Sequence, residues 1–245
     1  MSEIRLPGGF VSDVVRVDET VRRTPARNAP FIHELLDLFA QQGWQGAPRY
    51  LGIDAAGRET LSYLDGHVAW QPVQPPDVVS DESLAMVAQL VREFHDLTAG
   101  SSLAGDEQVV CHNDLSPKNT VYRDLGHGLR PVAFLDWDLA APGQHIHDVA
   151  HMCWQYLDLG PSIHDPAAAV RGLRLLCDAY GLVDRGDLVK TIMWWQDRCW
   201  RGIEAAATTG DPACVALRSA GVVDEVRAAW SWVADNQHVL DDGIK

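Results

Sequence analysis

The sequence predicts an α+β fold, with β-strands in the first part of the chain and helices in most of the rest. Four short segments rich in β-branched and aromatic residues predict strands, at residues 11–17, 20–24, 49–53 and 59–64. Beyond residue 80 the apolar residues recur at helical spacing instead. Hydrophobic residues make up 47% of the chain, which is enough for a substantial core.

One helix is expected among these strands. Pro30 suits a first helical turn, because the N–H that proline lacks would have no helical partner there. Gly43 favours the end of the helix. The apolar residues that follow helical spacing between these two positions are Ile32, Leu35, Leu36 and Phe39.

A change in composition at residues 65–80 predicts a division into two lobes. This segment contains Gly66 and prolines at positions 72, 75 and 76, which are typical of a connector. We therefore expect an N-terminal lobe at residues 1–64 and a larger helical lobe at 81–245. Ser80 or Asp81 should cap a helix that reaches about residue 98, and three or four helices should follow residue 138.

Charge, cysteine content and hydropathy exclude several classes of protein. The net charge is −14 and no basic stripe appears, so a nucleic-acid partner is not expected and cationic partners are favoured. The five cysteines are widely spaced without a C-x-x-C pair, which argues against a disulfide framework or zinc knuckle. No stretch approaches the ~18 apolar residues of a membrane span. No signal peptide is evident either, so we expect a cytoplasmic protein without a membrane partner.

The segment from residue 110 to 138 carries the most chemical information. Asp114 follows a short apolar strand and precedes a proline-containing loop, which places its carboxylate on a rigid, accessible turn. Asn119 begins one predicted strand and Asp136 ends another, and a hairpin turn at 124–128 would bring these two residues together. Phosphoryl transfer needs a carboxylate beside the acceptor hydroxyl and oxygen ligands for Mg²⁺. These three residues can supply both.

The same segment resembles the catalytic and metal-binding loops of the protein-kinase-like superfamily. His112, Asp114 and Asn119 match the pattern H-x-D-x-x-x-x-N, and Asp136 stands where protein kinases have the aspartate of D-F-G. The Asp136-Trp137 form is similar to the aminoglycoside phosphotransferase and choline kinase families. A downstream element that is similar to the G-x-P-x-x-D-L-A motif of the aminoglycoside phosphotransferases contains Pro142, Gly143, Asp148, Val149 and Ala150.

Two positions depart from the family pattern. Asn113 replaces the glycine that is usual in aminoglycoside phosphotransferases, and is more similar to the choline kinase form. Ser116 replaces the lysine that is typical of protein kinases. The resemblance therefore does not favour protein substrates.

The resemblance implies a two-lobe kinase-like fold, with a small antiparallel β N-terminal lobe and a mainly helical C-terminal lobe. It implies ATP and Mg²⁺ as cofactors. Asp114 would be the catalytic base, and Asn119 and Asp136 would be the metal ligands. His112 is expected to brace the loop, while Asp138 is either a second metal ligand or an exposed loop carboxylate.

The resemblance also implies nucleotide contacts in the N-terminal lobe. Gly8 and Gly9 look like part of the hairpin that covers the nucleotide. Arg23 lies on the strand where the family has its phosphate-binding lysine, and arginine binds phosphate without being equivalent to lysine. The following helix offers His33 or Glu34 as a partner for Arg23. Residues that resemble the interlobe hinge, whose backbone binds adenine, are Ser62, Tyr63 and Leu64.

Two further clusters permit other functions. His147 and His151 are four residues apart on an expected helix, a spacing that suits zinc, but the glutamate of the metalloprotease motif is missing. Trp194, Trp195 and Trp200 either belong to the helical core or form an aromatic wall around a quaternary ammonium group.

The expected function is that of a small-molecule kinase. It would transfer the γ-phosphoryl group of ATP to a hydroxyl of a small, cationic, aminoglycoside-like molecule. A choline- or ethanolamine-type amino alcohol is an alternative acceptor. A catalytically idle nucleotide-binding regulatory protein is the alternative outside the enzymes, because the usual phosphate-binding lysine is missing.

Overall fold

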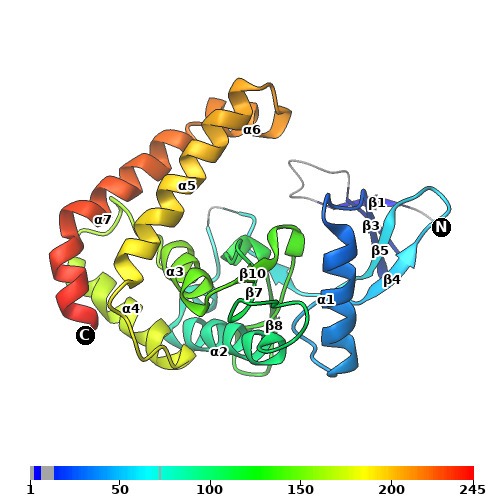
Figure 1. The fold of residues 1–245 in the computed structure, drawn as a ribbon, viewed down its shortest axis with the longest axis horizontal. Coiled ribbons are helices and arrows are strands. Elements are labelled where there is room, and N and C mark those ends of the chain that lie inside the picture. The colour runs from blue at the N-terminus through cyan, green and yellow to red at the C-terminus, as the bar shows by residue number, and fades with distance from the viewer. Residues whose placement is uncertain (1–2, 7–13, 72) are drawn as a thin grey trace. The chain divides into compact units, whose positions relative to one another are not determined.

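The computed structural model describes residues 3–6, 14–71 and 73–245 (Figure 1). The chain forms two compact units, Met1–His145 and Ile146–Lys245. The first unit contains the sheets and the second is helical, so the predicted α+β class is confirmed. The predicted lobe boundary near residue 64 lies inside the first unit, and the division at 1–64, 65–80 and 81–245 stays a prediction.

A five-stranded antiparallel sheet in the order β1-β2-β3-β5-β4 forms the N-terminal part of the first unit. Its strands are β1 (Ile4–Arg5), β2 (Val15–Val17), β3 (Thr20–Arg23), β4 (Tyr50–Ile53) and β5 (Glu59–Ser62). The predicted strands are confirmed, with shorter bounds, although residues 11–13 lie outside the described part of the chain. In the β3–β5 pair, Arg23 lies directly opposite Glu59. This register brings together two residues of the candidate site.

Helix α1 (Ala29–Gln41) follows β3 (Figure 1). Pro30 occupies its first turn, and its predicted apolar face is buried. Gly43 has a φ of +72°, a left-handed conformation that glycine adopts without steric cost, and it follows the last helical turn. The predicted helix is therefore confirmed at both ends.

The rest of the first unit surrounds residues 110–138, the segment that contains Asp114, Asn119 and Asp136. Helix α2 (Asp81–Thr98) begins at Ser80, whose hydroxyl accepts a hydrogen bond from the Ser83 N–H at 3.2 Å, as the sequence predicts. The helix packs against β7 (Val109–Cys111) and β9 (Leu129–Phe134). Strand β9 belongs to a second sheet, β6-β8-β9, with β6 (His67–Val68) and β8 (Thr120–Asp124). Strand β10 (Ala141–Gly143) pairs with β7.

The predicted connector at 65–80 is more regular than its composition indicates. It contains β6 and the 3₁₀ helix η1 (Pro76–Val79). Asp77 explains part of this order, because its side chain accepts a hydrogen bond from the Leu129 N–H at 3.1 Å. A contact between such distant segments cannot be predicted from the glycine and proline residues of the connector alone.

An aromatic cluster of Phe39, Trp44, Phe94 and Trp137 forms part of the core of the first unit. Trp137 lies 5.1 Å from the rings of both Phe39 and Phe94. It begins η3 (Trp137–Leu139), the short helix that follows Asp136. The cluster therefore fixes the loop that contains Asp136, Trp137 and Asp138, which we call the aspartate loop, against α1 and α2.

The second unit consists of helices. These are α3 (His145–Tyr156), which begins at the end of the first unit, α4 (Pro166–Tyr180), α5 (Leu188–Thr208), α6 (Pro212–Ser219) and α7 (Val222–Ile244). Helices α5 and α7 lie side by side, and α6 connects them (Figure 1). Five helices thus follow residue 138, where the sequence predicts three or four. Among the described residues, no helix is long and apolar enough to cross a membrane.

Candidate active site

The loop between β7 and β8 brings Asp114 and Asn119 into contact. Asn119 is buried in η2 (Pro117–Asn119), and its Nδ2 donates to the Asp114 carboxylate at 2.8 Å and to the Asp114 carbonyl at 2.9 Å. These bonds fix the amide so that its Oδ1 is turned away from Asp114. Within residues 3–6, 14–71 and 73–245, no hydrogen bond engages the amide oxygen of Asn119.

The same loop is fastened to β9 through His112. The imidazole Nδ1 accepts from the Asp114 N–H at 3.3 Å, and Nε2 lies 3.0 Å from the Leu135 carbonyl. Because a carbonyl only accepts, Nε2 is the donor of this contact, and Nδ1 is the acceptor of the other. His112 is fully buried and lies 4.5 Å from the Trp137 ring. Its position supports the predicted bracing role.

Asn119 and Asp136 lie side by side, as the predicted hairpin requires. Thr120 pairs with Phe134 across β8 and β9, and the Leu135 N–H donates to the Asn119 carbonyl at 2.8 Å. Asp136 follows directly, with φ +60° and ψ +64°. Its side chain is half exposed, which leaves the carboxylate accessible to a ligand.

Asn113 also has a left-handed backbone, with φ +63°. Its side-chain Nδ2 donates to the Leu139 carbonyl at 2.9 Å. Glycine and asparagine are the residues that adopt this conformation most readily. The departure from the family's glycine at this position is therefore conformationally conservative.

Arg23 faces three carboxylates, from Glu59, Asp138 and Asp136. Its Nε donates to Glu59, its Nη2 donates to Asp138, and its Nη1 lies 3.5 Å from Asp136. Burial by itself lowers the pKa of Arg23, but the surrounding carboxylates outweigh it and raise the pKa above its ordinary value. Burial raises the pKa of the Asp138 carboxyl, and the charge of Arg23 only partly offsets this effect.

Glu59 is the residue in this group that the sequence interpretation missed. It is 1% exposed and also contacts His33, whose Nε2 lies 2.9 Å from its carboxylate. Of the two helix residues that could partner Arg23, His33 is therefore the one that faces it, through Glu59. Glu34 is exposed. The sequence contains a signal for Glu59. Side chains two residues apart on a strand point to the same face, so Glu59 lies on the same face as the core residue Leu61. A carboxylate buried on that face requires a charged partner.

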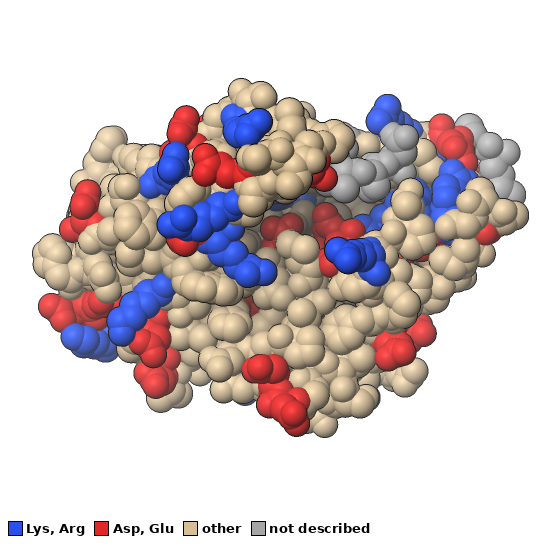
Figure 2. Space-filling view, turned by 45° about the horizontal axis from the view of Figure 1, so that its top comes forward, with Lys and Arg blue, Asp and Glu red and all other residues tan. Residues whose placement is uncertain are grey.

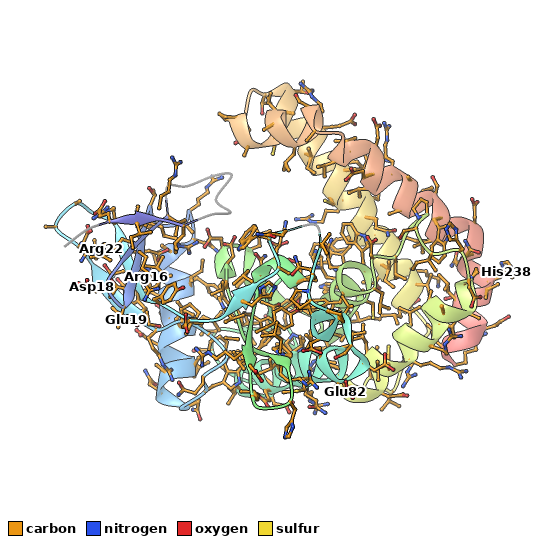
Figure 3. The ribbon with its side chains drawn as sticks, turned by 180° about the vertical axis from the view of Figure 1, so that it is seen from behind. Arg16, Asp18, Glu19, Arg22, Glu82 and His238 are labelled. Atoms are coloured by element: carbon orange, nitrogen blue, oxygen red, sulfur yellow. The ribbon has the colours of Figure 1, made fainter. Side chains whose placement is uncertain are left out.

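The predicted adenine-binding segment begins at Ser62, the last residue of β5, at the opposite end of that strand from Glu59. The Ser62 N–H donates to the Arg49 carbonyl and the Tyr63 N–H donates to the Glu19 carbonyl, both at 2.9 Å. Arg16 also lies over the Tyr63 ring at 3.6 Å from its centroid. Figure 3 shows Arg16 and Glu19 together at the β2–β3 turn. Two of the three predicted backbone N–H groups thus bond to the residues that directly precede β4 and β3. A base-binding role for Ser62, Tyr63 and Leu64 stays a prediction.

Gly8 and Gly9 lie outside the described residues. Their predicted place in the hairpin that covers the nucleotide accordingly stays a prediction.

The histidine and tryptophan clusters contact one another within the second unit. His147 stacks on Trp194 with ring centroids 5.6 Å apart, and His151 meets Trp195 edge-on at 5.0 Å. Trp195 donates from Nε1 to the His147 carbonyl at 2.8 Å. Arg198 lies 5.5 Å from the Trp194 ring. These contacts favour a packing role for His147, His151 and the buried Trp195, whereas Trp194 is 46% exposed and Trp200 lies under Arg201 and Arg227.

The oxygen atoms near Asp136 fit a magnesium ion. Asn119 presents its Oδ1, and Asp136 presents a half-exposed carboxylate from the adjoining strand end. Mg²⁺ prefers such hard oxygen donors, needs only one or two carboxylates and retains several waters. The residues present therefore fit the metal that the sequence interpretation expects.

The antiparallel N-terminal sheet and the helical C-terminal part define a kinase-like fold, and comparisons with solved structures agree. The GDP complex of aminoglycoside 2'-phosphotransferase-IIIa superimposes with a TM-score of 0.62 at 13% identity, covering 96% of this chain and 93% of that one. A choline/ethanolamine kinase family protein from Mesorhizobium loti gives a TM-score of 0.57 at 14% identity, with coverages of 95% and 92%. These identities establish the fold alone, and they confirm the predicted kinase-like class.

Sequence comparisons identify the family. The model described as "Phosphotransferase enzyme family", abbreviated APH, matches residues 101–185. The trifolitoxin immunity protein of Rhizobium leguminosarum bv. trifolii is 30% identical over 237 residues, which cover 84% of this chain and 86% of that protein. The chain belongs to the APH phosphotransferase family. Relatives with this fold bind nucleotides, since solved structures hold GDP in one case and ADP with streptomycin in another.

Proposed function

We propose that this protein is a Mg²⁺-dependent kinase that transfers the γ-phosphoryl group of ATP to a hydroxyl of a small cationic molecule. The observation that carries the proposal is the joined geometry of Asp114, Asn119 and Asp136. The side-chain amide of Asn119 donates to the Asp114 carboxylate, and the backbone carbonyl of Asn119 accepts from the N–H of Leu135, the residue before Asp136. A displacement of any one of Asp114, Asn119 and Asp136 therefore displaces the other two.

Each of these residues has a distinct part in the proposed reaction. The acceptor hydroxyl would bond to Asp114, which orients it and takes its proton as the new oxygen–phosphorus bond forms. The bond between the γ-phosphorus and the bridging oxygen breaks, and ADP leaves. Asn119 and Asp136 would hold Mg²⁺, which supplies charge neutralisation at the phosphates. Arg23 would contact the phosphates from β3.

A cationic acceptor is favoured by charge. The protein carries a net charge of −14, and on the face drawn in Figure 2 the acidic and basic side chains are interspersed among larger uncharged areas. An acidic protein attracts cations over distances comparable to the Debye length, about 8–10 Å at physiological salt. Aminoglycosides are such polycations, and choline or ethanolamine are smaller amino alcohols of the same sign.

The name of the 30%-identical relative adds a biological context to the proposal. That protein is an immunity protein for trifolitoxin. A phosphotransferase can give immunity by modifying a hydroxyl of a toxin. We therefore include protection of cells from a hydroxyl-bearing toxin in the proposed function, with an aminoglycoside-like toxin as the first class to examine.

The test is a screen for ADP release. Purified protein is supplied with Mg²⁺-ATP and, in separate wells, with aminoglycosides, choline, ethanolamine and other hydroxylated amines. We expect acceptor-dependent ADP release with at least one of them, lost when a chelator removes Mg²⁺. Retained ATP binding without turnover on any acceptor would favour the idle nucleotide-binding protein instead.

A further inference from the structure

The Arg23 side chain is connected to neighbouring elements of the N-terminal lobe through the Glu59 carboxylate. Its Nε donates to Glu59, which lies opposite it in the β3–β5 register, and the other Glu59 oxygen contacts His33 on α1. The His33 ring in turn stacks on Tyr50 of β4, with centroids 3.7 Å apart and planes 12° apart. The guanidinium is thus tied to two strands and a helix through one carboxylate.

Burial makes this attachment rigid. Glu59 is 1% exposed, while the side chains of Arg23 and His33 are 11% and 16% exposed. A carboxylate that is removed from water needs both of its oxygens bonded, and here each oxygen has its own cationic or N–H partner. The carboxylate has little freedom to release Arg23 while the sheet remains folded.

The far side of the guanidinium reaches the aspartate loop. Its two terminal nitrogens face Oδ1 of Asp138 and Oδ1 of Asp136, whose side chains are 36% and 50% exposed. A carboxylate has two oxygens, so this contact leaves the Oδ2 atom of Asp136 for a metal. Arginine can join three carboxylates at once because its five N–H donors form a planar fork, whereas the single nitrogen of lysine is a point charge.

We infer that Glu59 and His33 are positioning residues: they hold Arg23 so that its guanidinium aligns Asp136 and Asp138 for the metal–nucleotide complex. The helix of the lobe contributes a histidine, and the anchoring carboxylate comes from β5. A lysine at position 23 has one nitrogen in place of the planar fork, so we expect it to pair with Glu59 or with Asp136 and Asp138, but not with all three. The inference rests on the proposed function, since it assigns a purpose to the same site.

The experiment measures binding rather than turnover. Calorimetry gives the Mg²⁺-ATP affinity, and the electron paramagnetic resonance signal of Mn²⁺ gives the metal affinity in the presence of ATP. The variants are E59Q, R23K and the double variant E59Q/H33E, which moves the carboxylate from β5 to α1. E34Q is the matched control, because it removes an exposed carboxylate next to His33 on the same helix. Circular dichroism confirms that each variant is folded.

E59Q should weaken both affinities by about tenfold or more, the loss typical of one charge-assisted hydrogen bond. R23K should weaken them similarly, and E34Q should bind as the wild type does. E59Q/H33E should recover most of the lost affinity, which a purely packing role for Glu59 does not predict. R23K retains the positive charge on a part-buried strand, so it decides the question if E59Q fails to fold.

Three outcomes would overturn the inference. Wild-type affinity in folded E59Q or in R23K would show that the attachment is not needed, and a double variant as weak as E59Q would show that the charge is not what matters. A wild-type protein that binds no Mg²⁺-ATP would refute the proposed function itself, and this inference with it. The first two results leave the proposed function standing, so the failures can be told apart.

Discussion

Asn113 and Asp136 share a left-handed backbone, and each stands beside a functional group of the candidate site. Their φ angles are +63° and +60°. Non-glycine residues in this region are uncommon, and where they occur at active sites the surrounding structure holds them there. Here the Asn113 side chain bonds to the Leu139 carbonyl, and Asp136 is followed by the buried Trp137. The sequence motif gave the identity of these residues, but their backbone conformation depends on contacts made elsewhere in the fold.

Substitutions at position 113 should separate conformation from hydrogen bonding. Asn113→Ala should lower the free energy of unfolding by about 1–2 kcal/mol, because alanine adopts left-handed φ at a cost. Asn113→Gly removes the bond to Leu139 but tolerates the backbone, so its loss should be smaller. Urea unfolding measures both. Equal stability of the alanine variant and the wild type would refute the claim of a constrained backbone.

Asp114→Ala tests the catalytic residue. Turnover should fall by about 10²–10⁴-fold, the usual contribution of a general base, because the variant lacks the carboxylate assigned to accept the hydroxyl proton. The Mg²⁺-ATP affinity should stay close to that of the wild type. Steady-state kinetics with the best acceptor gives the first quantity and calorimetry the second.

Asp106→Ala is the control for that variant, since Asp106 is exposed on a turn of the same unit. It should match the wild type in both measurements. Undiminished turnover in the Asp114 variant would remove the catalytic assignment.

At the scale of secondary-structure elements, the sequence predicts the ends of helices and the local hairpin better than it predicts contacts between distant elements. Proline, glycine and serine marked the ends of α1 and α2 correctly, because capping and turn chemistry are local. The hairpin of β8 and β9 followed from two apolar strands and a glycine-containing turn. The pairing of Arg23 with Glu59 depends on the order of strands in the sheet, which strand propensity does not encode. For the same reason the regular structure in the 65–80 connector was not predicted.

The aromatic cluster should stabilise the first unit strongly. Phe94 of α2 is fully buried and lies 5.1 Å from Trp137, 6.0 Å from Trp44 and 6.4 Å from Phe39. Phe94→Ala should therefore cost about 3–5 kcal/mol in the free energy of unfolding, through lost burial and the cavity that remains. Chemical denaturation followed by tryptophan fluorescence measures this change.

Leu125→Ala is the comparison for Phe94, because Leu125 is 53% exposed in the β8–β9 turn. It should change the free energy of unfolding by no more than about 0.5 kcal/mol. If the two variants were equally stable, the cluster would not be the support of the aspartate loop that we describe.

At the scale of the whole molecule, the site described here lies entirely in the first unit. Its residues come from β3, β5, α1 and the loops around β7, β8 and β9. The second unit contributes helices whose histidine and tryptophan side chains pack together. The residues that the sequence predicts for magnesium and phosphoryl chemistry, Asp114, Asn119 and Asp136, therefore lie together in one unit. The identity of the acceptor depends on surface residues, and these residues form no sequence motif comparable to the one that contains Asp114 and Asn119.

Ligand binding should stabilise the folded chain in a metal-dependent way. At a concentration of Mg²⁺-ATP about 100 times its dissociation constant, binding adds about 2.7 kcal/mol, which corresponds to a rise in Tm of roughly 5–10 °C for a chain of this size. Differential scanning fluorimetry with and without a chelator measures the rise. Asp136→Asn should lose most of it, whereas Asp106→Asn should keep it. An equal rise in both variants would contradict the assignment of Asp136 as a metal ligand.

The central claim, phosphoryl transfer through Asp114, Asn119 and Asp136, is tested most directly by following the phosphate itself. ATP labelled at its γ-phosphate is incubated with the wild-type protein, Mg²⁺ and the acceptor that gives the fastest ADP release. We predict that the label appears on a hydroxyl of the acceptor, in an amount equal to the ADP formed, and that the Asp114→Ala variant transfers almost none. Label that is found only in inorganic phosphate, or transfer that is equal in wild type and variant, would contradict the account.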